Sequence, residues 1–485
     1  MMALRDVRRR HAEYYKESLR IAGRQFREGG EALTESLARL DRDWLSIQAA
    51  QAWAQAELKA DETVASLCSD FAGSAARLLD LYQHPQERAR WLILGLAAAR
   101  LCKDSIAECA HLGNLAACYL ALGSSREALD LYEQQIALAS DIQDEGATRG
   151  ALGGLGNAHA ALGDFQNAIT EHAQSLVRAR DVDDRHAEAM CLGNLGLAYA
   201  ALGKLDRALE FHRQHLAVAQ ELGDHHGESL ACGNLGNVYL KTGRTELAVD
   251  WFERQLRIAR EIGEKHGEGT ALANLGVAHG TFGNGALASK LYSQALVIFQ
   301  EIGDRRAESC VLGNMGQYHA NCGDLVEAMR LHKRALELSR ETGDRRSEGN
   351  DLNNLALAYS DLGDYQRAHD LYLQALSIKR EIGDQQGEAN TLGNLGLWYM
   401  ERGDIDRAIN LYTDQLKLAR AINDHRGTAT ASFNLSVALA ECGRLADAIE
   451  RAHDALKLFE ECGDITAIIV QQQLRAWQGS SEQQG

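Results

Sequence analysis

Proline is nearly absent from this sequence, which has a single proline, Pro85, in 485 residues. An interior proline costs an α-helix about 3 kcal/mol, so its scarcity over such a length favours helical structure. Aromatic residues are also few, at 6% of the chain, whereas glycine occurs 45 times. In a helical chain, so many glycines must serve turns and close helix packing.

Other absences narrow the classes of function. The sequence has no apolar run of about 18 residues and no signal-peptide pattern, so we expect neither membrane spanning nor secretion. The ten cysteines form no Cys-x-x-Cys motif, and most stand at small or apolar positions, such as Cys118, Cys191, Cys232 and Cys310. We interpret them as reduced, buried thiols, which indicates a cytoplasmic protein.

Positive charge is in short supply. Lys and Arg number 51 against 68 Asp and Glu, so the formal net charge is −17. Nucleic-acid affinity is largely cationic, so we expect no nucleic-acid partner. The sequence also lacks the His-Glu-x-x-His, Gly-x-Ser-x-Gly and Gly-x-x-x-x-Gly-Lys-Ser/Thr motifs. We therefore predict no catalytic residues, no metal and no cofactor, and expect that the protein is not an enzyme.

The chain does have a 40-residue repeat, which occurs nine times between residues 105 and 466. In the unit 223–262, one helical pattern runs from about His225 to Lys241 and a second from about Thr245 to Ile262. A glycine between the two patterns fits a left-handed helix C-cap. It recurs as Gly123, Gly163, Gly203, Gly243, Gly283, Gly323, Gly363, Gly403 and Gly443. An acid closes each unit, as Asp224 closes one and Asp344 another, and it is well placed to cap the next helix.

Six residues of this unit stand in the order and spacing of the tetratricopeptide (TPR) signature. They are Leu235, Gly236, Tyr239, Gly243, Ala248 and Phe252. The sequence therefore resembles the TPR family, whose usual period is 34 residues. The residue pattern of the repeat is similar to that of Pins-type adaptors, kinesin light chains and the TPR sensor arms of bacterial signal-transduction ATPases. The resemblance implies an all-α fold, a right-handed superhelical solenoid of antiparallel helix pairs.

The remaining residues divide into three segments. Residues 1–60 form a predicted N-terminal helical cap or linker, with helices at about 4–26 and 32–56. Residues 61–104 are expected to hold one degenerate helical repeat, with Pro85 in its turn. After the nine repeats of residues 105–466, residues 467–485 are expected to form a C-terminal cap helix with a disordered tail after Gln478.

An asparagine stands ten residues into the first helix of eight repeats, where packing does not obviously require an amide. We call this set the asparagine ladder: Asn114, Asn194, Asn234, Asn274, Asn314, Asn354, Asn394 and Asn434. The TPR resemblance implies that this helix face lines a concave groove. A side-chain amide has one acceptor and two donors, so it can pair with the backbone of an extended peptide. Small preceding residues, such as Gly233, would leave each amide reachable. The alternative is that each amide bonds a neighbouring repeat and fixes the stacking angle.

Neighbouring positions on the same helix face suggest what the ligand carries. They are Met190, Leu197, Leu230, Asn237, Lys241, Asn350, Asp361, Asn390, Glu401 and Glu441. The set is apolar toward the N-terminal repeats and polar or acidic toward the C-terminal ones, which predicts an extended segment with apolar and basic residues. The alternative is that the acids are simply solvated.

A second repeated acid lies in the first turn of each first helix, and a favourable interaction with the helix dipole explains it. It recurs as Glu188, Glu228, Glu268, Glu308, Glu348 and Glu388.

Two functions follow from these observations. The first is a scaffold that binds a protein or peptide in the TPR groove, with no membrane partner and with self-association through the terminal repeats as a further partner class. The second is the ligand-sensing arm of a STAND-type signalling ATPase system.

Overall fold

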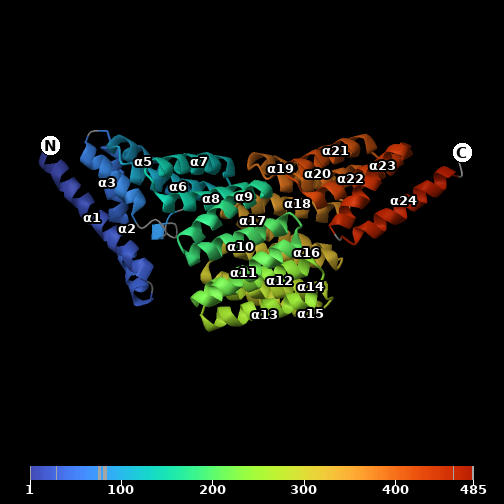
Figure 1. The fold of residues 1–485 in the computed structure, drawn as a ribbon, viewed down its shortest axis with the longest axis horizontal. Coiled ribbons are helices and arrows are strands. Elements are labelled where there is room, and N and C mark those ends of the chain that lie inside the picture. Colours follow the sequence, from blue (N-terminus) through green and yellow to red (C-terminus); the bar gives the residue numbers. More distant parts are fainter. Residues whose placement is uncertain are drawn as a thin grey trace. The chain divides into compact units, whose positions relative to one another are not determined.

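The computed structural model describes residues 2–28, 30–59, 61–74, 78–79, 83, 85–462 and 464–482. Across these residues the chain is all-α and has no strand, which confirms the predicted fold class (Figure 1). None of the described helices is long and apolar enough to cross a lipid bilayer. The chain divides into two compact units, Met1–Ala158 and His159–Gly485.

The first unit begins with two long helices and continues into the first repeat. Its helices are α1 (Met2–Glu28), α2 (Gly30–Ala56), α3 (Glu62–Gly73), α5 (Pro85–Cys102), α6 (Ser105–Ala121), α7 (Ser125–Asp141) and most of α8 (Glu145–Ala161). Leu19 of α1 and Leu40 and Ile47 of α2 belong to one apolar core. Pro85 is the first residue of α5, where its missing N–H costs nothing. It therefore begins a helix, whereas the sequence pattern predicted that it lies within a turn.

The second unit is a solenoid of helix pairs. Its helices are α9 (Phe165–Asp181), α10 (Arg185–Ala201), α11 (Leu205–Leu222), α12 (His225–Lys241), α13 (Thr245–Glu261), α14 (Lys265–Thr281), α15 (Gly285–Ile302), α16 (Arg305–Asn321), α17 (Leu325–Glu341), α18 (Arg345–Asp361), α19 (Tyr365–Glu381), α20 (Gln385–Met400), α21 (Ile405–Ala421), α22 (His425–Glu441), α23 (Leu445–Glu461) and α24 (Thr466–Glu482). The even-numbered helices from α10 to α22 are the first helices of repeats. Helix α24 extends four residues past Gln478, into the segment expected to be disordered, and residues 483–485 lie outside the described residues.

Turn and cap residues end and start these helices as the sequence predicts. All nine turn glycines have positive φ, between 72° and 82°, a conformation that side chains with a Cβ rarely adopt. The closing acid caps the next helix in most repeats: the Asp224 carboxylate accepts a hydrogen bond from the Gly227 N–H. Glu264 makes no such bond.

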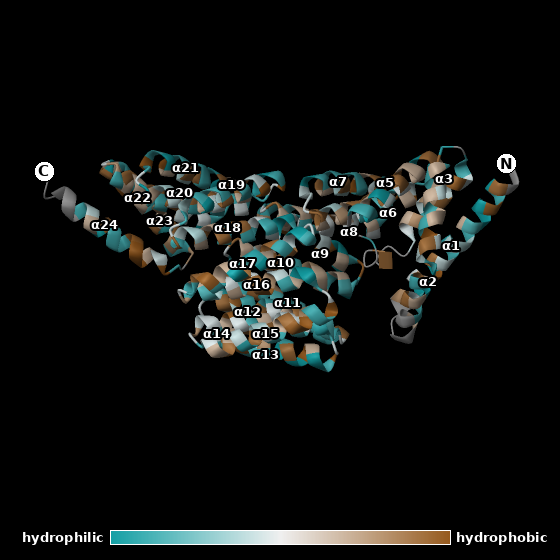
Figure 2. Ribbon diagram, turned by 180° about the vertical axis from the view of Figure 1, so that it is seen from behind, coloured by the Kyte–Doolittle hydropathy of each residue, from teal (hydrophilic) through white to brown (hydrophobic). Residues whose placement is uncertain are grey.

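Within a repeat, glycine lets the two helices approach closely. A Cβ on Gly236 of α12 would lie 2.4 Å from the Phe252 ring of α13, and one on Gly196 would lie 2.3 Å from the His212 ring. The rings therefore occupy the space above the glycines and fill the apolar core. Apolar and polar residues alternate along the helices in Figure 2, as expected for helices that bury one face.

Candidate functional site

Each first helix of the second unit carries a stripe of accessible residues. In α12 the stripe is His226, Leu230, Asn234, Asn237 and Lys241, all exposed except the half-buried Asn234. The equivalent positions are exposed or half-buried in every first helix from α10 to α22. These residues recur every three or four positions, so they share one helix face. We call the set of these faces the inner stripe.

The residues expected to set specificity lie on this stripe. Met190, Leu197 and Leu230 are 70%, 50% and 48% exposed. The polar members are exposed as well: Asn237, Lys241, Asn350, Asp361, Asn390, Glu401 and Glu441. Asn350 differs from the rest because its Oδ1 accepts a hydrogen bond from Lys379 Nζ, 2.5 Å away.

The ladder amides of the second unit are accessible and mostly unbonded. Asn314 is exposed, and the other six are half-buried. Asn394 donates a hydrogen bond to Asn353 of the preceding repeat, over 3.1 Å. Among the described residues of this unit, the remaining six side chains have no hydrogen-bond partner. Asn114, the eighth member, is half-buried in the first unit.

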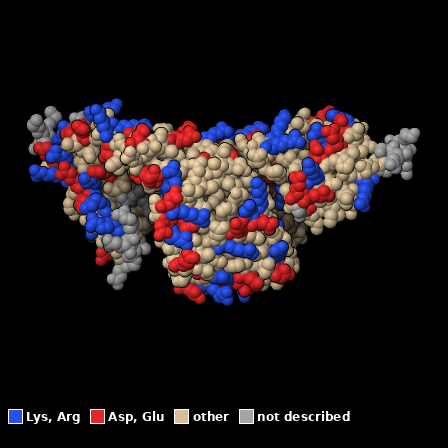
Figure 3. Space-filling view, viewed as in Figure 1, with Lys and Arg blue, Asp and Glu red and all other residues tan. Residues whose placement is uncertain are grey.

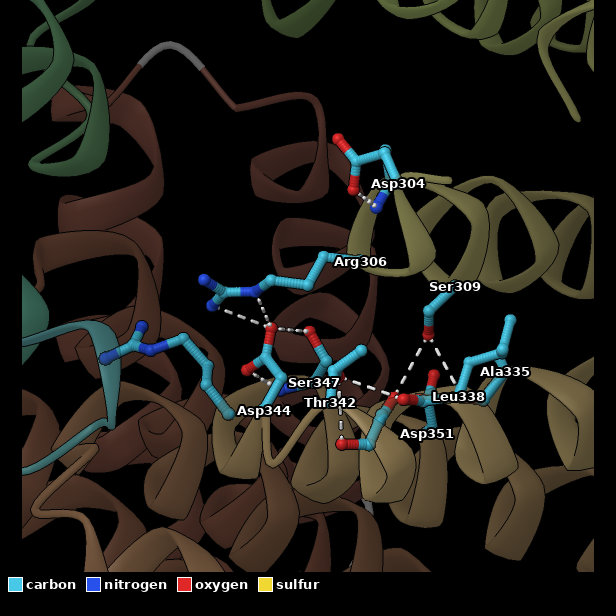
Figure 4. Close-up of polar contacts among 12 residues, drawn as sticks. Asp304, Arg306, Ser309, Ala335, Leu338, Thr342, Asp344, Ser347 and Asp351 are labelled. Atoms are coloured by element: carbon cyan, nitrogen blue, oxygen red, sulfur yellow. Dashed lines mark hydrogen bonds and ion pairs between the residues drawn. The ribbon is translucent and has the colours of Figure 1, made fainter. Parts of the chain in front are cut away.

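A different set of side chains links consecutive repeats. In the first helices from α12 to α22, the second residue reaches the acid at the start of the next first helix or of α24, as Arg306 reaches Asp344 over 2.9 Å (Figure 4). The other links are His226 to Glu264 at 3.2 Å, His266 to Asp304 at 3.4 Å, Arg346 to Asp384 at 3.7 Å, Gln386 to Asp424 at 2.9 Å, and Arg426 to Asp464 at 2.7 Å. Stacking of the repeats therefore has polar contacts that do not involve the ladder, and among the described ladder amides of this unit only Asn394 adds a bond between repeats.

The repeated glutamate makes a second kind of link. It accepts a hydrogen bond from a side chain eight residues earlier, near the end of the preceding second helix, as Glu268 does from Arg260 over 2.9 Å. The Lys265 and Arg260 side chains lower the pKa of Glu268. Its role thus goes beyond the helix dipole: it ties the end of one repeat to the start of the next.

The small residues before the ladder asparagines have a packing role that the sequence reasoning missed. A Cβ on Gly233 would lie 2.8 Å from the Gln255 amide, and one on Gly393 would lie 2.7 Å from the Gln415 amide. The second helix therefore occupies this space, which corrects the expectation that the glycines keep the amides open to a ligand.

One pocket, of about 540 Å³, opens on the inner stripe between α14 and α16. Its lining includes Thr270 and Asn274 of α14, Phe299 of α15, and Cys310 and Asn314 of α16. Cys310 is exposed, so its interpretation as a buried thiol is wrong; at its register in the repeat the side chain lies on the stripe.

Charges on the stripe are unevenly distributed. Burial and the nearby Glu401 raise the pKa of Asp361, so two acids lie close together at the ends of α18 and α20. Burial and the Arg426 guanidinium lower the pKa of Lys241. Lys241 is the single cation among the stripe residues predicted to set specificity, and Arg426 lies near it. On the face shown in Figure 3, the described Lys/Arg and Asp/Glu residues are interspersed.

A buried polar cluster lies beneath the stripe at α16–α19 (Figure 4). Ser339 donates a hydrogen bond to Asp351, and burial raises the pKa of Asp351 to about 7. Lys379, also buried, bonds Asp384 over 2.9 Å. The sequence already marks Lys379 as unusual, because the other eight repeats have an uncharged residue at its position. Within the described part of the chain, no group of three or more His, Cys, Asp or Glu side chains could hold a metal ion.

Comparisons with known proteins agree with this architecture. Residues 148–221, 228–301, 307–381 and 387–461 match one family model described as a tetratricopeptide repeat, and residues 111–145 match another with the same description. A search of curated proteins finds no significant match.

Three solved structures illustrate what a search of known structures finds to be similar to this chain. The Rap conjugation gene regulator of plasmid pLS20, in complex with the Phr* peptide, is 16% identical over 68% of this chain and 93% of its own, with a TM-score of 0.47. A STAND protein with a tetratricopeptide repeat sensor from Pyrococcus horikoshii is 14% identical over 72% and 55%, with a TM-score of 0.42. A putative kinesin light chain from Podosopora anserina is 21% identical over 40% and 95%, with a TM-score of 0.34.

Proposed function

Because the chain belongs to the tetratricopeptide repeat family, we propose that it is a non-enzymatic protein–protein interaction scaffold that holds an extended peptide or protein segment along the inner stripe. The asparagine ladder would grip the backbone of that segment. The flanking stripe residues would select its side chains.

One observation supports this proposal above the others: six ladder amides of the second unit have no hydrogen-bond partner among the residues that the structure describes. Other side chains already link the repeats, between first helices and through the glutamates, and among the described ladder amides of this unit only Asn394 makes a bond of the kind that the alternative role requires. Accessible amides that the fold does not use keep one acceptor and two donors for a ligand. Those groups complement the N–H and C=O of an extended chain, whose pattern does not depend on sequence.

The charge and polarity of the stripe support a ligand with apolar and basic residues. Met190, Leu197 and Leu230 offer exposed apolar surface toward the N-terminal repeats of the second unit. Glu401 lies close enough to Asp361 for its charge to add to the effect of burial and raise the pKa of Asp361. A Lys or Arg side chain between them would relieve this repulsion.

The test is the simultaneous Asn→Ala change at positions 234, 274, 314 and 354. The probe is a peptide selected from phage-displayed random dodecapeptides on the wild-type chain, and its affinity is measured by isothermal titration calorimetry. Each hydrogen bond contributes about 1 kcal/mol net, so losing several should weaken binding by at least about 100-fold.

The matched control is Asn410→Ala, which removes an exposed amide from the second helix α21, away from the stripe. It should leave the affinity unchanged. If the fourfold variant has wild-type helicity and binds the peptide as tightly as the wild type does, the ladder does not hold the ligand.

A further inference from the structure

The boundaries between repeats, which we call joints, are filled by different side chains. At the joint between α12 and α14, Gly233 leaves room for the buried Gln255, and Ala259 stands one turn later on α13. The same arrangement of glycine, large polar residue and alanine occurs with Gly193, His215 and Ala219, and with Gly393, Gln415 and Ala419. In these joints a side chain of the second helix fills the space beside the ladder asparagine.

The joint between α14 and α16 lacks that side chain. Ala273 and Ala295 stand where the neighbouring joint has glycine and glutamine, and Phe299 stands where it has alanine. The Phe299 ring lies against Gly269, whose Cβ would be 2.7 Å from it, and 5.7 Å from the His266 ring. The large side chain of this joint therefore stands one turn later on α15 than Gln255 does on α13. The pocket of about 540 Å³ opens at this joint, with Phe299 in its wall.

The chemistry of the pocket wall limits what it can take. Ala273, Phe299 and Val311 give it an apolar part. Asp304 accepts the Ala307 N–H and lies 3.4 Å from His266, so its charge is already engaged.

The second acid of the pocket, Asp344, is engaged as well. It caps α18 through the Ser347 N–H and bonds two nitrogens of Arg306. The lining charges therefore have partners, whereas the amides of Asn274 and Asn314 have none within the described part of the chain.

We propose that this pocket is the anchor subsite for one bulky aromatic side chain of the extended ligand, a proposal that rests on the function proposed above. The backbone lies across Asn274 and Asn314, and the side chain between them enters the pocket. Its volume falls within the range of small-ligand sites, roughly 300–1,000 Å³. The Phe299 ring is only 2% exposed, so an aromatic guest meets its edge, and a polar tip can bond the rim amides.

The main test transplants one joint onto another. The triple variant Ala273→Gly, Ala295→Gln and Phe299→Ala is made together with Gly269→Ser, because the Phe299 ring no longer covers Gly269 and the equivalent residue of α12 is Ser229. It then reproduces the residues of the α12–α14 joint, so it should fold and fill the pocket with the introduced Gln. The probes are the dodecapeptides selected on the wild-type chain. We expect them to share a Phe, Tyr or Trp, and to bind the triple variant at least about 10-fold more weakly.

A thermodynamic cycle locates the contact. Changing the peptide's aromatic residue to Ala should weaken binding to the wild-type chain by the same factor, and should have little further effect on the triple variant. A second variant, Cys310→Phe, fills the pocket from its exposed rim and should also weaken binding. Its control, Asn410→Phe, adds a ring at an exposed position of the second helix α21, away from the stripe, and should not.

The outcomes separate this proposal from the one on which it rests. If the selected peptides lack an aromatic residue, or bind the triple variant normally while remaining sensitive to the ladder change, the anchor subsite is wrong and the scaffold function stands. If no peptide is selected, or the selected peptides are sensitive to neither change, both proposals are wrong.

Discussion

Four buried histidines place imidazoles where charge is disfavoured. Burial lowers the pKa of His111, His172, His212 and His332 to about 4. In an unfolded chain the pKa is near 6.5, so the unfolded state binds more protons between pH 6.5 and 4. Stability from these residues is therefore complete above about pH 6.5 and declines as the pH falls toward 4.

At the residue scale we predict that His212→Phe makes the chain less sensitive to acid. The equivalent residue of the next repeat is Phe252, so the ring fits this register. A fully buried imidazole with this shift contributes up to about 3 kcal/mol of acid destabilisation. The measurement is the thermal midpoint from pH 7.5 to 4.5. The variant should lose less stability over this range than the wild type, whereas His225→Gln, at an exposed site, should follow the wild type. Equal acid losses in His212→Phe and the wild type would contradict the burial argument.

Some residues could be placed from the sequence and others could not. Periodicity placed the ladder asparagines on one accessible face, because helix geometry fixes which positions share a face. It could not show that Gly233 makes room for Gln255, because that contact depends on how a second helix crosses the first. The signal was there to find: the repeats with Gln135, Gln255 and Gln415 all have glycine before the asparagine.

At the element scale, the acid at the start of a first helix serves two purposes. Asp344 caps α18 and also receives Arg306 of the preceding repeat, with its side chain only 11% exposed. Asp364 caps α19 within its own repeat, has a 40% exposed side chain, and pairs only with Arg367. Both aspartates accept a backbone N–H of the helix that they cap, and Asp344 adds two contacts, one from the Ser347 hydroxyl and one from Arg306 of the preceding repeat.

We therefore predict that Asp344→Ala destabilises the chain more than Asp364→Ala does. Losing a cap costs about 1 kcal/mol, whereas losing a cap together with a buried charge-assisted contact should cost about 2–3 kcal/mol. The midpoint of urea unfolding, followed by circular dichroism, compares them. Equal shifts would mean that the contact between repeats adds no stability.

The boundaries of the elements were the easiest part to predict. Turn glycines and capping acids mark them locally, so helix ends in the repeats agree within one or two residues, as in α12 and α13. The joints could not be predicted in this way, because their filling depends on residues from three helices. Even so, the sequence contains one clue. Where a large residue replaces the usual alanine, as in Phe299 and Lys379, a glycine stands opposite it on the first helix: Gly269 faces Phe299 and Gly349 faces Lys379.

At the scale of the molecule, the repeat explains why the fold was predictable. In a solenoid each unit contacts mainly its neighbours, so the period, two helices and a turn determine the architecture without long-range pairing information. The N-terminal region lacks that advantage: residues 1–60 have no repeat, and the sequence supported only helices there. Ligand identity is not encoded in the period, because the shared residues are structural.

The same nearest-neighbour logic predicts that damage stays local. Helix α24 buries Val470 and Leu474 against Phe459 of α23, at the end of the second unit. Deleting residues 466–485 should uncover this core and loosen α22 and α23, while α10–α13 lose nothing that they contact. Hydrogen exchange measured by mass spectrometry should therefore show faster exchange in the last repeat and unchanged protection in α10–α13. Faster exchange throughout the second unit would show instead that the solenoid unfolds as a single cooperative body.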